Sequence, residues 1–127
     1  MADKSVAQKL LFKENYTVIL INEPENYRAT LGEFPQGVTI LNETNKPADL
    51  IQVFLTTGAE METRLTNLKA SLKPGGLLWL TYSKGTSGVK TDVNRDIIRE
   101  YVEKNGYKTV AMISVDDTWS AIRLKVV

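Results

Sequence analysis

The stretch Leu72–Tyr82, which reads LKPGGLLWLTY, decides the expected fold of this chain. Its Pro74-Gly75 pair is typical of the centre of a type II turn, in which the glycine adopts a positive φ angle. The residues after the turn, Leu77–Tyr82, form an almost continuous apolar run. Such a short run is typical of a parallel strand that is covered on both faces of its sheet. We therefore expect a central parallel strand at this position.

Upstream of this strand, two runs have the same apolar, β-branched character and predict further buried strands: Thr17–Ile21 and Asp49–Leu55. Helical patterns separate the strands. The helix expected after the Thr57/Glu60 capping box carries one apolar stripe, because its large apolar residues recur at helical spacing. That stripe consists of Met61, Leu65, Leu68 and Leu72.

Weaker patterns predict the remaining elements of the first four-fifths of the chain. A capping box of Ser5 and Gln8 indicates a short first helix. We also expect a short helix over Glu25–Leu31 and a short strand over Val38–Leu41. A last helix is expected to begin at Asp92, with its inward side formed by Val93, Ile97, Tyr101 and either Ile98 or Val102.

The chain closes with two expected strands, Thr109–Val115 and Trp119–Val126, joined by only three residues. A connection that short requires antiparallel neighbours, whereas strands separated by helices are normally parallel. We therefore expect a Rossmann-like three-layer α/β sandwich, with a mainly parallel sheet and a C-terminal antiparallel hairpin. The expected strand order is 2-1-3-4-6-5, in one domain over residues 1–127.

The connection between Glu43 and Asp49 is the open point of this topology. It is too short for a helical crossover, which needs a dozen or more residues. Either the chain runs extended back across the sheet, or the second and third strands pair differently.

Composition excludes several kinds of chemistry. The 127 residues contain no Cys and no His, so thiol nucleophiles, thiolate metal sites and imidazole bases are excluded, and we expect no metal. A net charge of +1 indicates no bulk attraction to nucleic acid or to a membrane. No run approaches the roughly 20 apolar residues of a membrane span, and the N-terminal residues do not predict a signal peptide. We expect a cytoplasmic protein.

The segment Leu72–Leu80 resembles the LKPGG turn and strand of class I S-adenosylmethionine (SAM)-dependent methyltransferases, and the closing antiparallel pair is also similar to that fold. The resemblance implies a truncated methyltransferase-like core. In that family the first strand ends in an acidic residue that is followed by a glycine-rich turn. Here Leu20 stands at the acidic position, and the glycine positions are occupied by Asn22, Pro24 and Asn26.

These departures bear on the cofactor. Pro24 removes a backbone donor, and Glu23 and Glu25 add negative charge where the carboxylate of the cofactor would lie. We therefore expect no cofactor and a degenerate, non-catalytic domain. The alternative is an active SAM-dependent methyltransferase with an atypical first motif, in which Glu43, near the end of the second strand, would bind the ribose.

Three separated motifs resemble a second, uncharacterised family, domain-of-unknown-function family 3052. They are Ser5–Leu10, Ser87–Asp92 and Asp117–Arg123, and together they span nearly the whole chain. This resemblance implies no known activity.

The polar loop that follows the fourth expected strand is the first candidate site. It leaves the carboxyl end of a parallel strand and enters a helix, where ligands of open α/β sheets bind. Its ammonium groups, hydroxyls and helix N-terminal N–H groups predict a site for a small anionic ligand or a protein partner. The alternative is a solvated loop with a helix cap at its end. The candidate residues are Lys84, Ser87, Gly88, Lys90, Thr91 and Asp92.

The turn between the last two strands is the second candidate. Asp116, Asp117 and Trp119 could orient a polar ligand, and Arg123 could face the polar loop. However, neighbouring side chains on a strand point to opposite faces, so we favour turn formation by the carboxylates and packing by the indole.

Self-association is the third hypothesis. An open sheet leaves an edge strand, which Arg123 and Lys125 would protect by charge. Trp119 on the same strand would instead anchor a homodimer.

Overall fold

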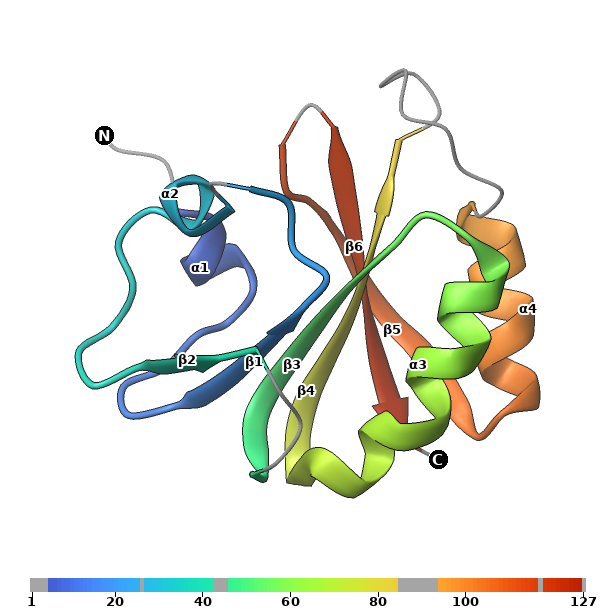
Figure 1. Cartoon of the computed structure of the whole chain (residues 1–127), viewed down its shortest axis with the longest axis horizontal. Helices are drawn as coiled ribbons and strands as arrows, with labels where there is room; N and C mark the ends of the chain where they lie inside the picture. The colour runs from blue at the N-terminus through green and yellow to red at the C-terminus, as the bar shows by residue number, and fades with distance from the viewer. Residues whose placement is uncertain (1–4, 26, 43–45, 85–93, 117, 127) are drawn as a thin grey trace.

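The computed structural model of the chain describes residues 5–25, 27–42, 46–84, 94–116 and 118–126. Within these residues, six strands form one sheet in the order β2-β1-β3-β4-β6-β5, and four helices pack against it (Figure 1). The strands are β1 (Thr17–Ile21), β2 (Thr39–Leu41), β3 (Ala48–Leu55), β4 (Leu72–Ser83), β5 (Tyr107–Ser114) and β6 (Trp119–Val126). The helices are α1 (Val6–Lys9), α2 (Tyr27–Leu31), α3 (Gly58–Ser71) and α4 (Arg95–Lys104).

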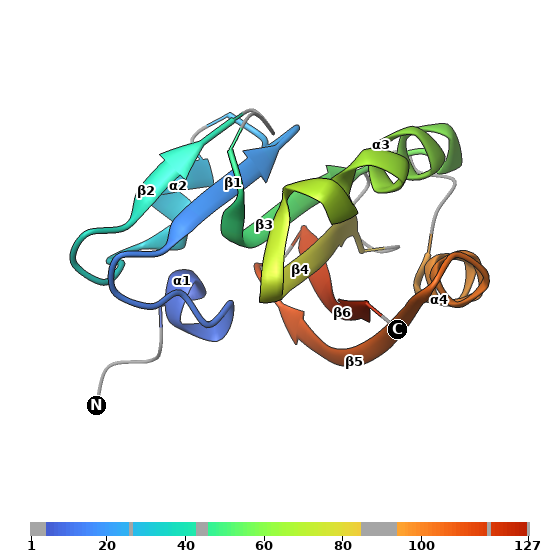
Figure 2. The same ribbon diagram turned by 90° about the horizontal axis from the view of Figure 1, so that it is seen from below.

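The strand order and strand directions confirm the predicted α/β fold. Strands β2, β1, β3 and β4 are parallel, and β6 is antiparallel to both β4 and β5. Two apolar clusters occupy the two faces of the sheet. One cluster includes residues of α1 and α2, and the other includes residues of α3 and α4. Figure 2 shows α1 and α2 beside β1 and β2, and α3 and α4 toward the other end of the sheet.

The pairing of β2 and β3 agrees with the first of the two expected arrangements. Both strands pair with β1, on its opposite sides, so the chain passes from one side of β1 to the other between Leu41 and Ala48. Crossing two strand spacings covers about 10 Å. The seven residue-to-residue steps from Leu41 to Ala48 can span roughly 25 Å. Because β2 is short, this length is enough both to return along the strand direction and to cross to the other side of β1.

Two boundaries differ from the expected ones. Strand β4 begins at Leu72, because this residue already pairs with Ala48 before the turn, and Gly75 has the expected positive φ of 76°. Helix α4 begins at Arg95, because the side chain of Asn94 accepts the N–H of Ile97 and caps the helix there.

The side of α4 that faces the core also differs from the expected one. Ile98 and Val102 are buried, whereas Ile97 is 42% exposed. Asp92 and Val93 lie outside the described residues. Within the described part of the chain, no helix is long and apolar enough to span a membrane.

Candidate functional site

The carboxyl ends of β1, β2 and β3 lie side by side because these strands are parallel neighbours. A cavity of about 420 Å³ lies where β1 and β2 end. Its size falls within the ordinary range of small-molecule sites. It is lined by Glu23, Pro24, Tyr27, Arg28, Ala29 and Asn42.

Three polar side chains of this cavity are connected to one another. The amide of Asn42 donates to both carboxylate oxygens of Glu23, at 2.8 and 2.9 Å, and to the carbonyl oxygen of Leu20 at 3.1 Å. The guanidinium group of Arg28 donates to the amide oxygen of Asn42 at 3.3 Å. The cavity therefore presents a carboxylate and a guanidinium group with an amide between them.

Asn22 explains how β1 turns into this site without the glycine-rich sequence. Its φ is 61°, a left-handed conformation that asparagine tolerates better than most residues. Its amide donates to the carbonyl oxygen of Phe54 at 3.1 Å and to Glu60 at 2.9 Å. Asparagine thus supplies the turn that glycine would provide and ties the end of β1 to the end of β3.

A buried chain of hydrogen bonds supports the floor of the cavity. The hydroxyl of Tyr27 donates to Gln52 at 2.9 Å, and the amide of Gln52 donates to Thr81 at 2.9 Å. Burial raises the pKa of Tyr27, so its hydroxyl stays protonated and remains a donor. This chain fixes α2, and with it the cavity wall, to β3 and β4.

Sequence reasoning overlooked Gln52, although one signal was present. Gln52 is the only polar residue inside the apolar run Leu50–Leu55, and it is fully buried. A polar side chain in a buried strand needs a partner, because an unpaired one is costly.

Lys84 is the only residue of the candidate loop within the described residues. Its ammonium group donates to the hydroxyl of Ser114 at 2.7 Å and to the carbonyl oxygen of Asp116 at 2.6 Å. Lys84 therefore fastens the end of β4 to the turn between β5 and β6. The other candidates of this loop lie outside the described residues, namely Ser87, Gly88, Lys90, Thr91 and Asp92, and so does Glu43.

The second candidate has the turn geometry that we favoured for it. One carboxylate oxygen of Asp116 accepts the backbone N–H groups of Thr118 and Trp119, both at 2.8 Å. The indole of Trp119 packs edge-on against Phe54, with ring centroids 5.2 Å apart. Asp117 lies outside the described residues.

Arg123 pairs with Trp79 in β4, and the backbone N–H of Lys84 bonds to Thr118, five residues before Arg123 in β6 and roughly 16 Å away. Residues 85–93 of the loop after β4 lie outside the described residues, so the expected approach of Arg123 to this loop stays a prediction. Arg123 and Lys125 are not on an edge strand, because β6 lies between β4 and β5. The edge strands are β2 and β5.

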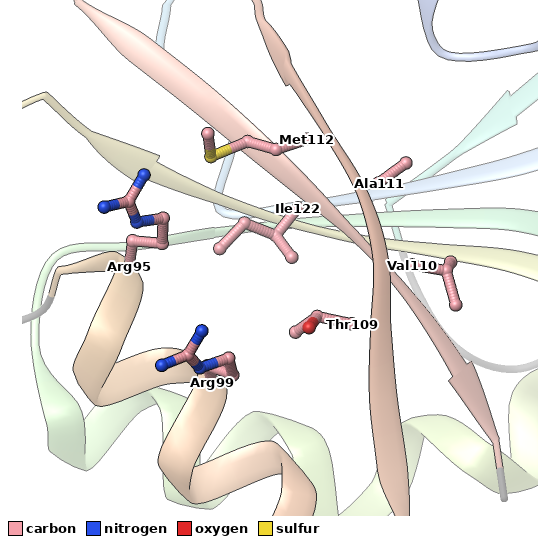
Figure 3. Close-up of a pocket in the computed structure, with 7 residues that line it drawn as sticks. All are labelled: Arg95, Arg99, Thr109, Val110, Ala111, Met112 and Ile122. Carbon is pink, nitrogen blue, oxygen red and sulfur yellow. The ribbon is translucent and has the colours of Figure 1, made fainter.

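No group of three or more acidic residues in the described part of the chain is arranged to hold a metal ion. A smaller hollow of about 220 Å³ lies between α4 and β5 (Figure 3).

Comparison with solved structures identifies proteins with a similar fold. A SAM-dependent methyltransferase from Aquifex aeolicus superimposes with a TM-score of 0.64 at 16% identity, covering 96% of this chain and 88% of that one. DhpI in complex with SAH gives a TM-score of 0.63 at 10% identity, covering 95% and 82%. The ribosomal protein L11 methylase from Lactobacillus delbrueckii subsp. bulgaricus gives 0.61 at 10% identity, covering 95% and 74%.

These likenesses confirm the methyltransferase-like fold. The sequence itself matches no protein-family model and no curated protein. The resemblance to domain-of-unknown-function family 3052 therefore stays a prediction.

The same structures correct the expectation that no cofactor is involved. DhpI is similar to this chain in its complex with SAH and also in a complex with SAM and HEP. The departures after β1 had suggested a lost site, but a fold shared with cofactor complexes overturns that inference.

Proposed function

We propose that this chain binds SAM at the carboxyl edge of β1 and β2. The observation that carries the proposal is the cavity in which Glu23 and Asn42 contact each other directly. A carboxylate accepts hydrogen bonds from adjacent hydroxyls, and an amide both donates and accepts. This pair therefore suits the two ribose hydroxyls of a nucleoside.

The charges around the cavity fit the other end of the same ligand. Arg28 lines the cavity and would take the carboxylate of the cofactor, because guanidinium groups pair well with carboxylates. The negative charge of Glu23 would attract the positively charged sulfonium group of SAM. Pro24 offers no backbone N–H, so side chains hold the ligand here where a glycine-rich turn would use its backbone.

When bound, SAM supplies an electrophilic methyl group. We propose that this chain binds the cofactor without transferring that group, because its sequence contains neither His nor Cys to act as a general base or nucleophile toward a methyl acceptor. An active methyltransferase with an atypical first motif is the alternative. Methyl transfer from SAM to RNA or protein added to the purified chain would favour the alternative.

Calorimetric titration with SAM and with SAH tests the binding site. Glu23→Gln and Asn42→Ala should each weaken binding about tenfold, because each removes hydrogen bonds to a charged or hydroxyl-bearing partner. Glu25→Gln is the matched control, since Glu25 is an exposed carboxylate two residues away that does not line the cavity. The absence of heat at millimolar ligand, or equal losses in all three variants, would contradict the proposal.

A specific observation supports a second binding function at the end of β4. The hydroxyl of Ser83 is buried and has no hydrogen-bond partner among the described residues. A buried polar atom without a partner is costly, so a small anionic ligand beside the loop after β4 would gain a contact there. Thermal-shift measurements with nucleotides and phosphorylated metabolites test this function. Lys90→Ala should abolish any stabilisation, and an unchanged response would exclude the loop.

A further inference from the structure

Strand β5 is a long, exposed edge of the sheet. It has eight residues and, among the residues that the structure describes, pairs with β6 alone, whereas the opposite edge strand, β2, has three residues. Val110, Ala111 and Met112 are exposed in succession, and the side chains of Val110 and Met112 are 40% and 49% exposed. Natural sheets usually shorten, charge or cover such an edge, because it offers unpaired backbone groups to another strand.

The hydrogen-bond register identifies the backbone groups on that edge. The N–H of Val115 bonds to the carbonyl oxygen of Trp119, so this is a hydrogen-bonded pair of the antiparallel ladder. Such pairs alternate along the ladder. The N–H and C=O groups of Met112 and Ser114 therefore point away from β6, toward the free edge.

Cationic side chains lie near this edge on both faces of the sheet. On one face, Arg95 and Arg99 of α4 line the hollow between α4 and β5 together with Thr109 and Met112 of β5 (Figure 3). On the other face, Arg123 and Lys125 of β6, one strand in from the edge, line a groove of about 590 Å³. Val110, where a register shift interrupts the pairing with β6, lines both hollows.

Most of these cations lack an internal partner. Among the described residues, the only ion pair in this group joins Arg95 to Asp96 at 4.0 Å, and both side chains are largely exposed. Arg99, Arg123 and Lys125 form no ion pair within the described part of the chain. Their charge is therefore available to a binding partner.

The geometry points to an acidic, extended peptide segment of a partner protein that adds a strand to the outer edge of β5. Successive side chains of an added strand point to opposite faces of the sheet. One set of acidic side chains then faces Arg95 and Arg99, and the alternate set lies across β5 from Arg123 and Lys125, two strand spacings or about 10 Å away. The backbone groups of Met112 bond to the peptide backbone.

Charge and chemistry argue against two other occupants. A second copy of this chain, paired edge to edge across a two-fold axis, would bring identical cations together, and like charges at such positions repel. A nucleic acid offers no strand of N–H and C=O groups for the edge. This inference is independent of cofactor binding, because β5 lies at the opposite end of the sheet from β1 and β2.

Fluorescence anisotropy at low salt tests the inference with a labelled octapeptide, (Glu-Glu-Val-Val)₂, which carries acidic residues on both faces of a strand. We expect saturable binding that weakens as salt rises, because exposed charges are screened. The same peptide with Lys in place of Glu should not bind.

Two sets of variants separate the backbone contact from the charges. Met112→Pro removes an outward N–H without removing a hydrogen bond to β6 and should weaken binding about fivefold, whereas Met112→Ala, which keeps that N–H, should remain within about twofold. Arg99→Ala and Arg123→Ala, on opposite faces, should each weaken binding about threefold. Circular dichroism melts verify that each variant is folded.

Several results would overturn the inference. They are the absence of binding at millimolar peptide, binding that Met112→Pro leaves unchanged, and insensitivity to both arginine substitutions. A single-stranded oligonucleotide that binds as well as the peptide and ignores Met112→Pro would assign the cations to nucleic acid. A wild-type dimer that Met112→Pro dissociates would assign the edge to self-association.

Discussion

Removing the hydroxyl of Tyr27 tests whether the buried hydrogen-bond chain supports the fold. In Tyr27→Phe, the amide oxygen of Gln52 loses its donor while remaining buried, because Gln52 is 0% exposed. An unsatisfied buried polar group costs about 1–3 kcal/mol. We therefore expect the free energy of unfolding to fall by about 2 kcal/mol. With an unfolding entropy of about 0.27 kcal/mol/K for this chain length, the Tm should fall by roughly 7 °C.

A double-mutant cycle isolates the interaction between the two side chains. Gln52→Leu removes the partner of both Tyr27 and Thr81 and should cost about 2–3 kcal/mol. In the double variant, the hydroxyl and the amide are both gone, so neither group is left buried without the other as its hydrogen-bond partner. The double variant should cost about 2 kcal/mol, well below the sum of the single losses.

Urea unfolding followed by far-UV circular dichroism provides the free energies, and an unchanged m-value would show that the unfolded state is unaffected. Losses that add to within about 0.5 kcal/mol would refute the reasoning, since independent sites behave in that way. A neutral Tyr27→Phe substitution would refute it as well.

Two further predictions concern stability. Partial burial opposes ionisation of Glu60, but hydrogen bonds from Thr56 and Thr57 outweigh it and hold the pKa of this carboxyl below its ordinary value of 4.5. Its ionised form therefore stabilises the fold above that value, and this contribution is lost as the pH falls through the lowered pKa. Urea unfolding at pH 6 and pH 3 should show a smaller acid-induced loss in Glu60→Gln than in the wild type; equal losses would contradict this. Trp79→Phe should lower the free energy of unfolding by about 1–3 kcal/mol, because the indole N–H donates at 3.0 Å to the carbonyl oxygen of Leu10 in the core. Phenylalanine keeps one aromatic ring there but leaves a small cavity, which adds to the loss. A loss below about 0.5 kcal/mol in thermal unfolding would therefore show that this bond does not hold α1 to β4.

The candidate site shows where sequence reasoning works and where it stops. The loss of the glycine-rich turn after β1 was visible in the sequence, and it led to the expectation of no cofactor. The structure shows that Asn22 adopts the left-handed conformation a glycine would have taken, so the turn survives the substitution. The glycine-rich motif is one way to allow a positive φ in the turn after β1, and an asparagine at that position is another.

Contacts between distant residues were beyond sequence reasoning. The partners Glu23 and Asn42 are 19 residues apart, and Tyr27 and Gln52 are 25 apart. Lys84, a candidate ligand-binding residue, is hydrogen-bonded to Ser114 in the adjoining hairpin, 30 residues away. Side chains of this kind acquire partners only when the sheet brings their strands together.

The sequence by itself determined the strands, the helices and their order in the sheet, because apolar periodicity, helix caps and connection lengths act over a few neighbouring residues. Even the short route from β2 to β3 was among the two alternatives that connection length allowed. Only the tertiary structure decided which side chains share a cavity and which faces carry unpaired cations. Val110, for example, lines the hollows on both faces of the sheet. Such an arrangement depends on the register and twist of strands far apart in the chain, and no local pattern encodes it.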